Sequence, residues 1–379
     1  MRAWFVVLSI FVVLVLLLPG AALATTPASQ DGLQINWHVA NSSGLRNPGA
    51  FPASAYANGT YLVSSWANVG GRIWASKDAR NWSVVWKGND VPTYIVPGGP
   101  GFVAWASGIL VSKNGHKWTS ANAGVPRRLL NSDYVQLASV NGVVAAFPGS
   151  GGGFWSSDGL TWRAIAKGAG PVGPITLAGD GSSLWALTGG RDFDTGTLSP
   201  VKVWMTTDGK NWSVTSQLPD SRHSSGLSAA FGPLGGVVIG GARAWYAADG
   251  VHWHEATNTP SITAKGPDVI NAVVADESGF IVTARRDQPG CVYDPAQSRA
   301  ITWTSVDGKT WRKMSSTGFL GREIDQLFIS GRTLFGISID WSHENLNGTG
   351  VAWRAPLPMV ATDNAPPPSP LPKPGNQGC

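Results

Sequence analysis

Ser156-Ser157-Asp158-Gly159-Leu160-Thr161-Trp162 is one of six copies of the same heptapeptide in this chain. The other copies occupy residues 76–82, 112–118, 206–212, 247–253 and 305–311. The consensus is Ser-x-Asp-Gly-x-x-Trp, hereafter the box. Two places before each box stands an aromatic residue or Leu: Trp74, Leu110, Phe154, Trp204, Trp245 and Trp303. Six copies with so few exceptions indicate a repeat protein.

The residue types of the box predict a β-hairpin held by its own side chains. Asp-Gly between two apolar strands is a strong hairpin signal, because Gly adopts positive φ without strain. We expect the acidic side chain to accept hydrogen bonds from N–H groups of its own turn, and the Trp to pack against a neighbouring repeat. We therefore assign structural rather than catalytic roles to Asp78, Asn114, Asp158, Asp208, Asp249 and Asp307, and to Trp82, Trp118, Trp162, Trp212, Trp253 and Trp311.

The spacing of the boxes predicts an all-β fold, a seven-bladed β-propeller. Two apolar runs with a Gly-containing turn precede each box, so each repeat contains four strands. The six repeats between Trp37 and Trp311 have an average length of about 46 residues. A seventh pair of inner strands near 324–338 is followed by a third strand at 350–353 but by no box. The segment 35–39 resembles an outer strand without its hairpin. We therefore expect the propeller to span 33–358, with its last blade closed by the amino-terminal strand.

These boxes resemble the Asp-box, or BNR, repeat of sialidases and of many exported bacterial propellers without the sialidase catalytic signature. The resemblance covers roughly residues 33 to 356. It implies the fold more than the activity, since the box occurs in hydrolases, receptors and assembly factors alike. A sialidase would also need an Arg-Ile motif near the first inner strand, a Tyr–Glu pair and an Asp acid. The only Arg-Ile here, Arg72-Ile73, precedes Trp74 on a predicted third strand.

Composition excludes several classes of protein. The 379 residues carry a net charge of +5, only 13% are charged, and the chain contains 48 Gly, 26 Pro and 19 Trp. This profile argues against a disordered chain, a coiled coil and a helix bundle, and it favours short strands joined by tight turns. The basic residues form no run longer than the pairs Arg127-Arg128 and Arg285-Arg286. We therefore predict no nucleic-acid partner.

The amino-terminal end of the chain indicates export, and the carboxyl-terminal end indicates a spacer. An apolar run at 3–18 is followed by Ala22-Leu23-Ala24, which fits a signal peptidase site, so we predict a signal peptide over 1–24 and a linker over 25–32. The alternative is an uncleaved anchor, which would be the only contact with a membrane. The Pro-rich segment 359–379 is expected to be a disordered tail. In an oxidising, extracytoplasmic compartment Cys291 and Cys379 can form a disulfide.

Three long loops on the face opposite the boxes are the candidate ligand site. They lie at 189–201, 285–299 and 341–350 in the fourth, sixth and seventh blades, and such loops on a rigid scaffold often carry function. Convergent charged and aromatic groups there suit sugars or acidic groups, although solvation alone also explains polar loops. The candidate ligand-binding residues are Arg191, Asp192, Asp194, Arg285, Arg286, Asp287, Tyr293, Asp294, Trp341, His343 and Glu344.

The sequence favours a binding protein over an enzyme. No cofactor motif or metal site is evident, and the only neighbouring histidines are His252 and His254. We predict an exported, monomeric, non-catalytic propeller that binds a glycan or an extracellular protein at or outside the cell surface. The first alternative is a sialidase-like glycoside hydrolase with its catalytic residues in the three long loops. The second is an assembly factor for a membrane complex.

Overall fold

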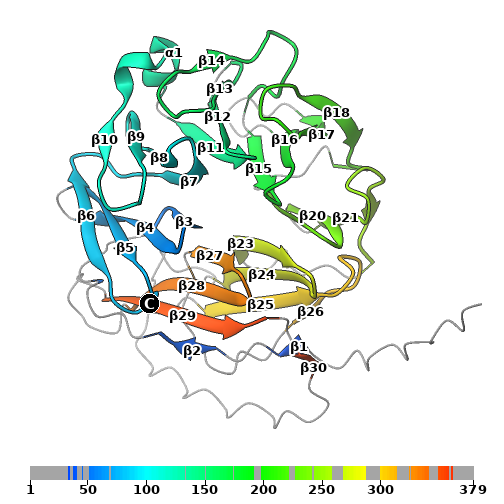
Figure 1. Ribbon diagram of the computed structural model, residues 1–379. Helices are drawn as coiled ribbons and strands as arrows, with labels where there is room; N and C mark the ends of the chain where they lie inside the picture. The colour runs from blue at the N-terminus through cyan, green and yellow to red at the C-terminus, as the bar shows by residue number, and fades with distance from the viewer. Residues whose placement is uncertain are drawn as a thin grey trace, which may run out of the picture.

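The protein is a seven-bladed β-propeller (Figure 1). The computed structural model describes residues 33–34, 37–40, 45, 51–67, 70–132, 134–149, 151–173, 175–191, 198–221, 227–240, 243–257, 268–286, 299–313, 324, 326–340, 349–357 and 360–361. Over this part of the chain the only helices are two short ones, η1 (Asn122–Gly124) and α1 (Arg127–Leu130). None of its helices has the length and hydropathy needed to cross a bilayer.

Each blade is a four-stranded antiparallel meander, as the sequence predicts. Blade 1 contains β3 (Ser54–Ala57), β4 (Thr60–Ala67), β5 (Gly70–Ser76) and β6 (Ser83–Gly88). Blade 2 contains β7 (Tyr94–Gly98), β8 (Gly101–Trp105), β9 (Ile109–Ser112) and β10 (Thr119–Ser120). Blade 3 contains β11 (Val135–Val140), β12 (Val143–Pro148), β13 (Phe154–Ser156) and β14 (Arg163–Ala164). Blade 4 contains β15 (Ile175–Gly179), β16 (Leu184–Arg191), β17 (Leu198–Thr206) and β18 (Ser213–Gln217).

The remaining blades follow the same order. Blade 5 contains β19 (Ser228–Gly232), β20 (Gly235–Gly240), β21 (Arg243–Ala247) and β22 (His254–Glu255). Blade 6 contains β23 (Asp268–Asp276), β24 (Gly279–Arg286), β25 (Arg299–Ser305) and β26 (Arg312–Lys313). Blade 7 contains β27 (Gln326–Ser330), β28 (Thr333–Asp340) and β29 (Thr349–Pro356), and its outer strand is β2 (His38–Val39). A separate two-stranded pair joins β1 (Leu33–Gln34) to β30 (Val360–Ala361).

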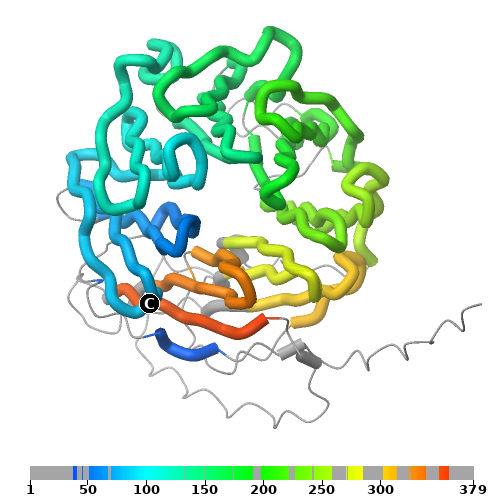
Figure 2. The backbone as a smooth tube through the Cα atoms, in the orientation of Figure 1, coloured from blue at the N-terminus to red at the C-terminus, as the bar shows by residue number. Residues whose placement is uncertain are grey.

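The amino-terminal strand closes the ring, as predicted. β2 pairs with β29 in the register His38 with Arg354 and Val39 with Trp353, and Figure 2 shows this blue strand alongside the red one. The inner strands contact one another in the cyclic order β3, β7, β11, β15, β19, β23, β27 and back to β3. The last blade therefore meets the first.

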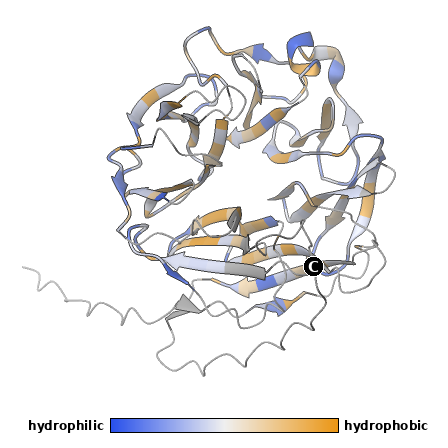
Figure 3. Cartoon of the chain, turned by 180° about the vertical axis from the view of Figure 1, so that it is seen from behind, coloured by the Kyte–Doolittle hydropathy of each residue, from blue (hydrophilic) through white to orange (hydrophobic). Residues whose placement is uncertain are grey.

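The hydrophobic core lies between the blades. Seven separate clusters of buried side chains each join two neighbouring blades, for example blades 2 and 3 through Trp105 and Phe154, and blades 7 and 1 through Phe335 and Trp74. Figure 3 shows most of the apolar residues on the strands, and it shows hydrophilic residues on outer strands at the periphery of the ring. Because a single four-stranded sheet cannot bury its own apolar faces, each blade depends on both neighbours.

The meander assigns each turn to one of two faces. The boxes join third to outer strands, and they share one face with the turns that join inner to second strands, because all the strand pairs are antiparallel. We call this the box face. The inner strands begin at the opposite face, which we call the mouth face. The predicted long loops leave strands that end on the mouth face.

Candidate functional site

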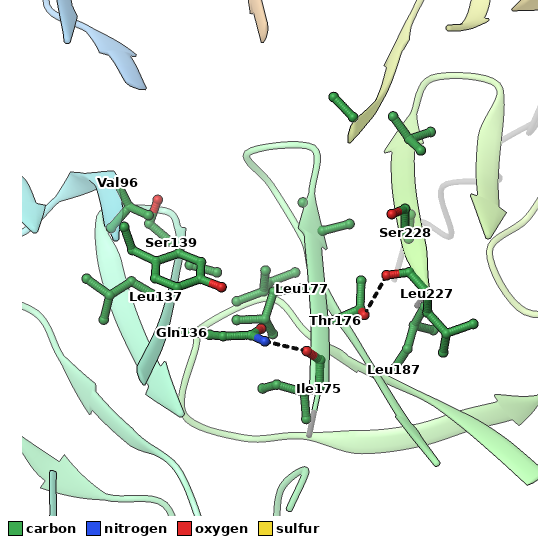
Figure 4. A pocket seen from close by; sticks show the side chains of 18 of the residues that line it. Val96, Gln136, Leu137, Ser139, Ile175, Thr176, Leu177, Leu187, Leu227 and Ser228 are labelled. Atoms are coloured by element: carbon green, nitrogen blue, oxygen red, sulfur yellow. Dashed lines mark hydrogen bonds between the residues drawn. The ribbon is translucent and has the colours of Figure 1, made fainter. Parts of the chain in front are cut away.

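An axial cavity of about 860 Å³ runs between the inner strands (Figure 4). Six of these strands contribute to its wall: β7, β11, β15, β19, β23 and β27. Because the strands converge on one axis, many of the positions that line the cavity carry short side chains, including Ala138, Ser139, Thr176, Ser228 and Ala272. The volume lies in the range of small-molecule sites.

A chain of neutral hydrogen-bonding groups crosses the mouth of this cavity from blade 2 to blade 4. The Tyr94 and Tyr134 hydroxyls are 2.8 Å apart and hydrogen-bonded. The Gln136 amide Nε2 donates to the Tyr134 hydroxyl at 2.8 Å and to the Ile175 carbonyl at 2.6 Å. We call Tyr94, Tyr134 and Gln136 the mouth cluster. Figure 4 shows the hydrogen bond from Gln136 to the Ile175 carbonyl. It also shows the hydrogen bond from Thr176 Oγ1 to the Leu227 carbonyl, which is 3.0 Å long.

The Tyr94 phenol of the mouth cluster stays uncharged at ordinary pH. Burial raises the pKa of the Tyr94 phenol, and its hydrogen bond with Tyr134 raises it further. Tyr134 is 49% exposed, and its ring lies nearly perpendicular to that of Tyr94, with the two ring centroids 6.2 Å apart. The site therefore combines a fixed set of donors and acceptors with one exposed tyrosine.

A second polar contact joins blade 7 to blade 1 beside the same cavity. Gln326 accepts a hydrogen bond from Ser54 Oγ at 3.2 Å and donates through Nε2 to the Pro52 carbonyl at 3.2 Å. None of the described residues that line the axial cavity is charged. In the described part of the chain, no group of three or more His, Cys, Asp and Glu side chains is placed to hold a metal ion.

The box-face end of the axis also holds a cavity. A cavity of about 610 Å³ there shares wall residues with the axial cavity and adds Phe231 of β19, together with Asp180 and Pro233 from the turns that follow β15 and β19. Asp180 Oδ1 accepts hydrogen bonds from the Ser182 and Ser183 N–H groups at 2.9 and 2.7 Å. This carboxylate therefore stabilises its own turn.

The boxes form a repeated hydrogen-bonded hairpin on the box face. In blade 3, Asp158 Oδ1 accepts from the N–H groups of Leu160 and Thr161 at 2.8 and 2.7 Å and from Ser156 Oγ at 2.9 Å. These bonds, first of all that from Thr161, lower the pKa of Asp158 to about 2. Asp78, Asp208, Asp249 and Asp307 accept the equivalent backbone bonds.

Most of the candidate loop residues lie outside the described residues: Asp192, Asp194, Asp287, Tyr293, Asp294, Trp341, His343 and Glu344, together with Cys291 and Cys379. The backbone of Arg191 ends β16, and the backbones of Arg285 and Arg286 end β24. Both strands end on the mouth face. The role of these residues in ligand binding stays a prediction.

The residues of the mouth cluster are not among those that the sequence predicts as a ligand site. Tyr94 and Gln136 lie in inner strands, which we interpreted only as apolar scaffold, and Tyr134 immediately precedes one. One feature of the sequence could have predicted this cluster: an aromatic or amide residue at the start of an inner strand. A residue at that position faces the propeller axis at the mouth face.

No family model and no curated protein matches the sequence. Among solved structures, the chain is similar to the N-terminal domain of Nup159, with a TM-score of 0.48, 8% identity and coverage of 86% of this chain and 96% of that one. It is similar to PorZ of Porphyromonas gingivalis, with a TM-score of 0.42, 12% identity and coverage of 80% and 43%. It is also similar to an ancestral GH74 enzyme, with a TM-score of 0.45, 13% identity and coverage of 68% and 37%. The chain thus spans less than half of the last two.

Proposed function

We propose that this protein is an exported, non-catalytic β-propeller that binds a neutral glycan at the mouth of its axial cavity. The observation that carries the proposal is the mouth cluster, in which uncharged donors and acceptors adjoin the exposed ring of Tyr134. The ligand would enter from the mouth face and reach the short side chains that line the axis.

The chemistry of the mouth cluster matches that of a sugar. A sugar hydroxyl both donates and accepts hydrogen bonds, and so do phenol and amide groups. Gln136 and the two tyrosines are already fixed by mutual hydrogen bonds, so binding costs little side-chain entropy. The Tyr134 ring offers a rigid apolar surface to the C–H face of a pyranose.

The same lining supports binding rather than hydrolysis. Glycoside hydrolysis usually uses two carboxyl groups flanking the scissile bond, or a Tyr–Glu pair in sialidases. The described walls of the axial cavity offer phenol, amide and hydroxyl groups instead.

We also infer that the boxes belong to the Asp-box, or BNR, type of repeat. The shared pattern of two N–H groups donating to one carboxylate oxygen supports this assignment. The sequence of residues 1–24 supports export through a cleaved signal peptide, with 25–32 as a linker and 359–379 as a tail outside the propeller.

The test begins with a glycan array probed with the full chain, followed by calorimetric titration of the strongest neutral oligosaccharide. We expect binding, and we expect Tyr134→Ala and Gln136→Ala each to weaken it about tenfold, equivalent to about 1.4 kcal/mol. Tyr134→Phe should weaken it less, because it keeps the ring and loses only the hydroxyl.

The matched control is Tyr246→Phe, since Tyr246 is a half-buried tyrosine of blade 5 that contacts His254 away from the mouth. This variant should bind as tightly as the wild type. Release of sugar from the bound oligosaccharide or from a fluorogenic sialoside would refute the non-catalytic assignment. Unchanged affinity in Tyr134→Ala would refute the site.

A further inference from the structure

A third cavity, of about 480 Å³, lies on the mouth face of blade 3, away from the axis. It is separate from the axial cavity, with which it shares no lining residue. Its wall consists of one residue of α1, the turn between β12 and β13 with the first residue of β13, and the last residue of β14 with the segment that follows it. We call it the blade 3 cavity.

Glycines give this cavity its shape. A Cβ at Gly151 would overlap the guanidinium of Arg128, so the missing side chain lets that group lie against the turn. Leu129, fully buried in the core between blades 2 and 3, anchors α1 and thereby fixes the position of Arg128. Gly152 forms a bridge with Val172, and the Ile165 N–H donates to the Gly153 carbonyl at 2.9 Å. The backbone on both sides of the cavity is therefore held together.

The cavity combines two cationic groups with an apolar floor. Arg128 and Lys167 lie among its lining residues and both are exposed, whereas no described lining residue is acidic. The floor contains the buried side chains of Phe154 and Ile165, and the wall adds Val172, which is 54% exposed. An arginine binds a carboxylate through two parallel N–H donors. An apolar surface beside it can contact the hydrocarbon part of the same ligand.

We propose that the blade 3 cavity binds an organic carboxylate with a compact apolar body, independently of the glycan proposed at the axis. Arg128 donates hydrogen bonds to the carboxylate, and Lys167 adds a second positive charge. The apolar floor contacts the hydrocarbon part of the ligand. The mouth face would then carry two sites with different chemistry, one neutral and one anionic.

The test uses benzoate as probe and saturation-transfer NMR titration of the full chain. Benzoate should bind, and benzyl alcohol, which keeps the ring and lacks the charge, should bind at least about tenfold more weakly. Arg128→Gln and Lys167→Gln should each weaken benzoate binding about three- to tenfold, and the double variant should weaken it more than either. Arg128→Lys should recover part of the affinity, because it restores charge without the paired donors.

Lys87→Gln is the matched control, because Lys87 is an exposed lysine on the outer strand of blade 1. It should leave benzoate binding unchanged, and Tyr134→Ala should as well, so failure of the glycan site does not affect this result. Glucuronate separates an acidic sugar from an apolar acid, and tighter binding of glucuronate than of benzoate would contradict the apolar floor. Absence of benzoate binding, or equal binding by the double variant, would overturn the site.

Discussion

At the scale of single residues, the box of blade 2 makes the hydrogen bonds of the other boxes with an amide in place of the carboxylate. In blade 2, Asn114 Oδ1 accepts from the N–H groups of His116 and Lys117 at 2.9 and 3.3 Å. In blade 3, Asp158 makes the same two bonds at 2.8 and 2.7 Å. The turn thus needs an acceptor at this position, and the negative charge shortens the bonds.

This comparison predicts unequal effects for two substitutions of Asp158. Asp158→Ala removes the acceptor and should lower the free energy of unfolding by about 1 kcal/mol, as loss of a helix N-cap does. Asp158→Asn keeps the acceptor that blade 2 uses and should cost less. Denaturation in urea at pH 7 measures both, and an equal loss in the two variants would contradict the role given to the acceptor.

The charge of Asp158 adds a pH dependence. Its pKa falls from the usual 3.8 to about 2 in the fold, so its contribution is complete above about pH 4 and disappears as the pH falls toward 2. The stability difference between the wild type and Asp158→Asn should therefore shrink as the pH falls from 4 to 2. A difference that stays constant over this range would show that the charge contributes nothing.

At the scale of elements, the boxes could be predicted because their signal is local. Hairpin, Asp acceptor and Trp all lie within seven residues, and Gly159 has φ +71° while its α-carbon faces Val103 and Val111 of the preceding blade. The helix α1 could not be predicted, since it spans only four residues and depends on burying Leu129 against blades 2 and 3.

The contacts within the mouth cluster could not be predicted for a different reason. Tyr94 and Tyr134 are 40 residues apart, and only the placement of blade 2 beside blade 3 brings their hydroxyls together. No spacing rule in the sequence connects them. The long loops carry many charged residues, which favour the prediction of a ligand site, whereas the described residues that line the axial cavity are uncharged.

The box tryptophans differ in one measurable way. Trp162 and Trp212 are buried alike, at 6% and 7% exposure, but Trp162 Nε1 donates to the Gly159 carbonyl at 3.2 Å. Trp212 Nε1 is buried without a hydrogen-bond partner among the described residues. Both Trp→Phe variants shrink the side chain, but only Trp162→Phe also loses a bond, so it should be less stable than Trp212→Phe by about 1 kcal/mol. Equal melting temperatures in calorimetry would contradict this difference.

At the scale of the whole molecule, the ring depends on contacts between residues near the two ends of the sequence. The side chains of Trp37 and Trp353 are buried in the cluster that joins blades 6 and 7, and the Ala40 N–H donates to the Ala352 carbonyl at 2.8 Å. Without β2, the strand β29 would present an unpaired edge, and exposed edges favour association with other chains. Blade 7 has no box because its third strand, β29, and its outer strand, β2, are far apart in the sequence and are not joined by a hairpin.

Two truncations test this closure. Deleting residues 1–36 removes β1 but keeps Trp37 and β2, whereas deleting 1–40 removes all three. The longer deletion should destabilise the protein by about 3–5 kcal/mol relative to the shorter one, the usual cost of removing a large buried aromatic side chain. It should also self-associate through β29, and a synthetic peptide of residues 33–45 should restore its melting temperature. If both truncated proteins melt together and stay monomeric in sedimentation, β2 does not hold the ring closed, and the inter-blade clusters suffice without it.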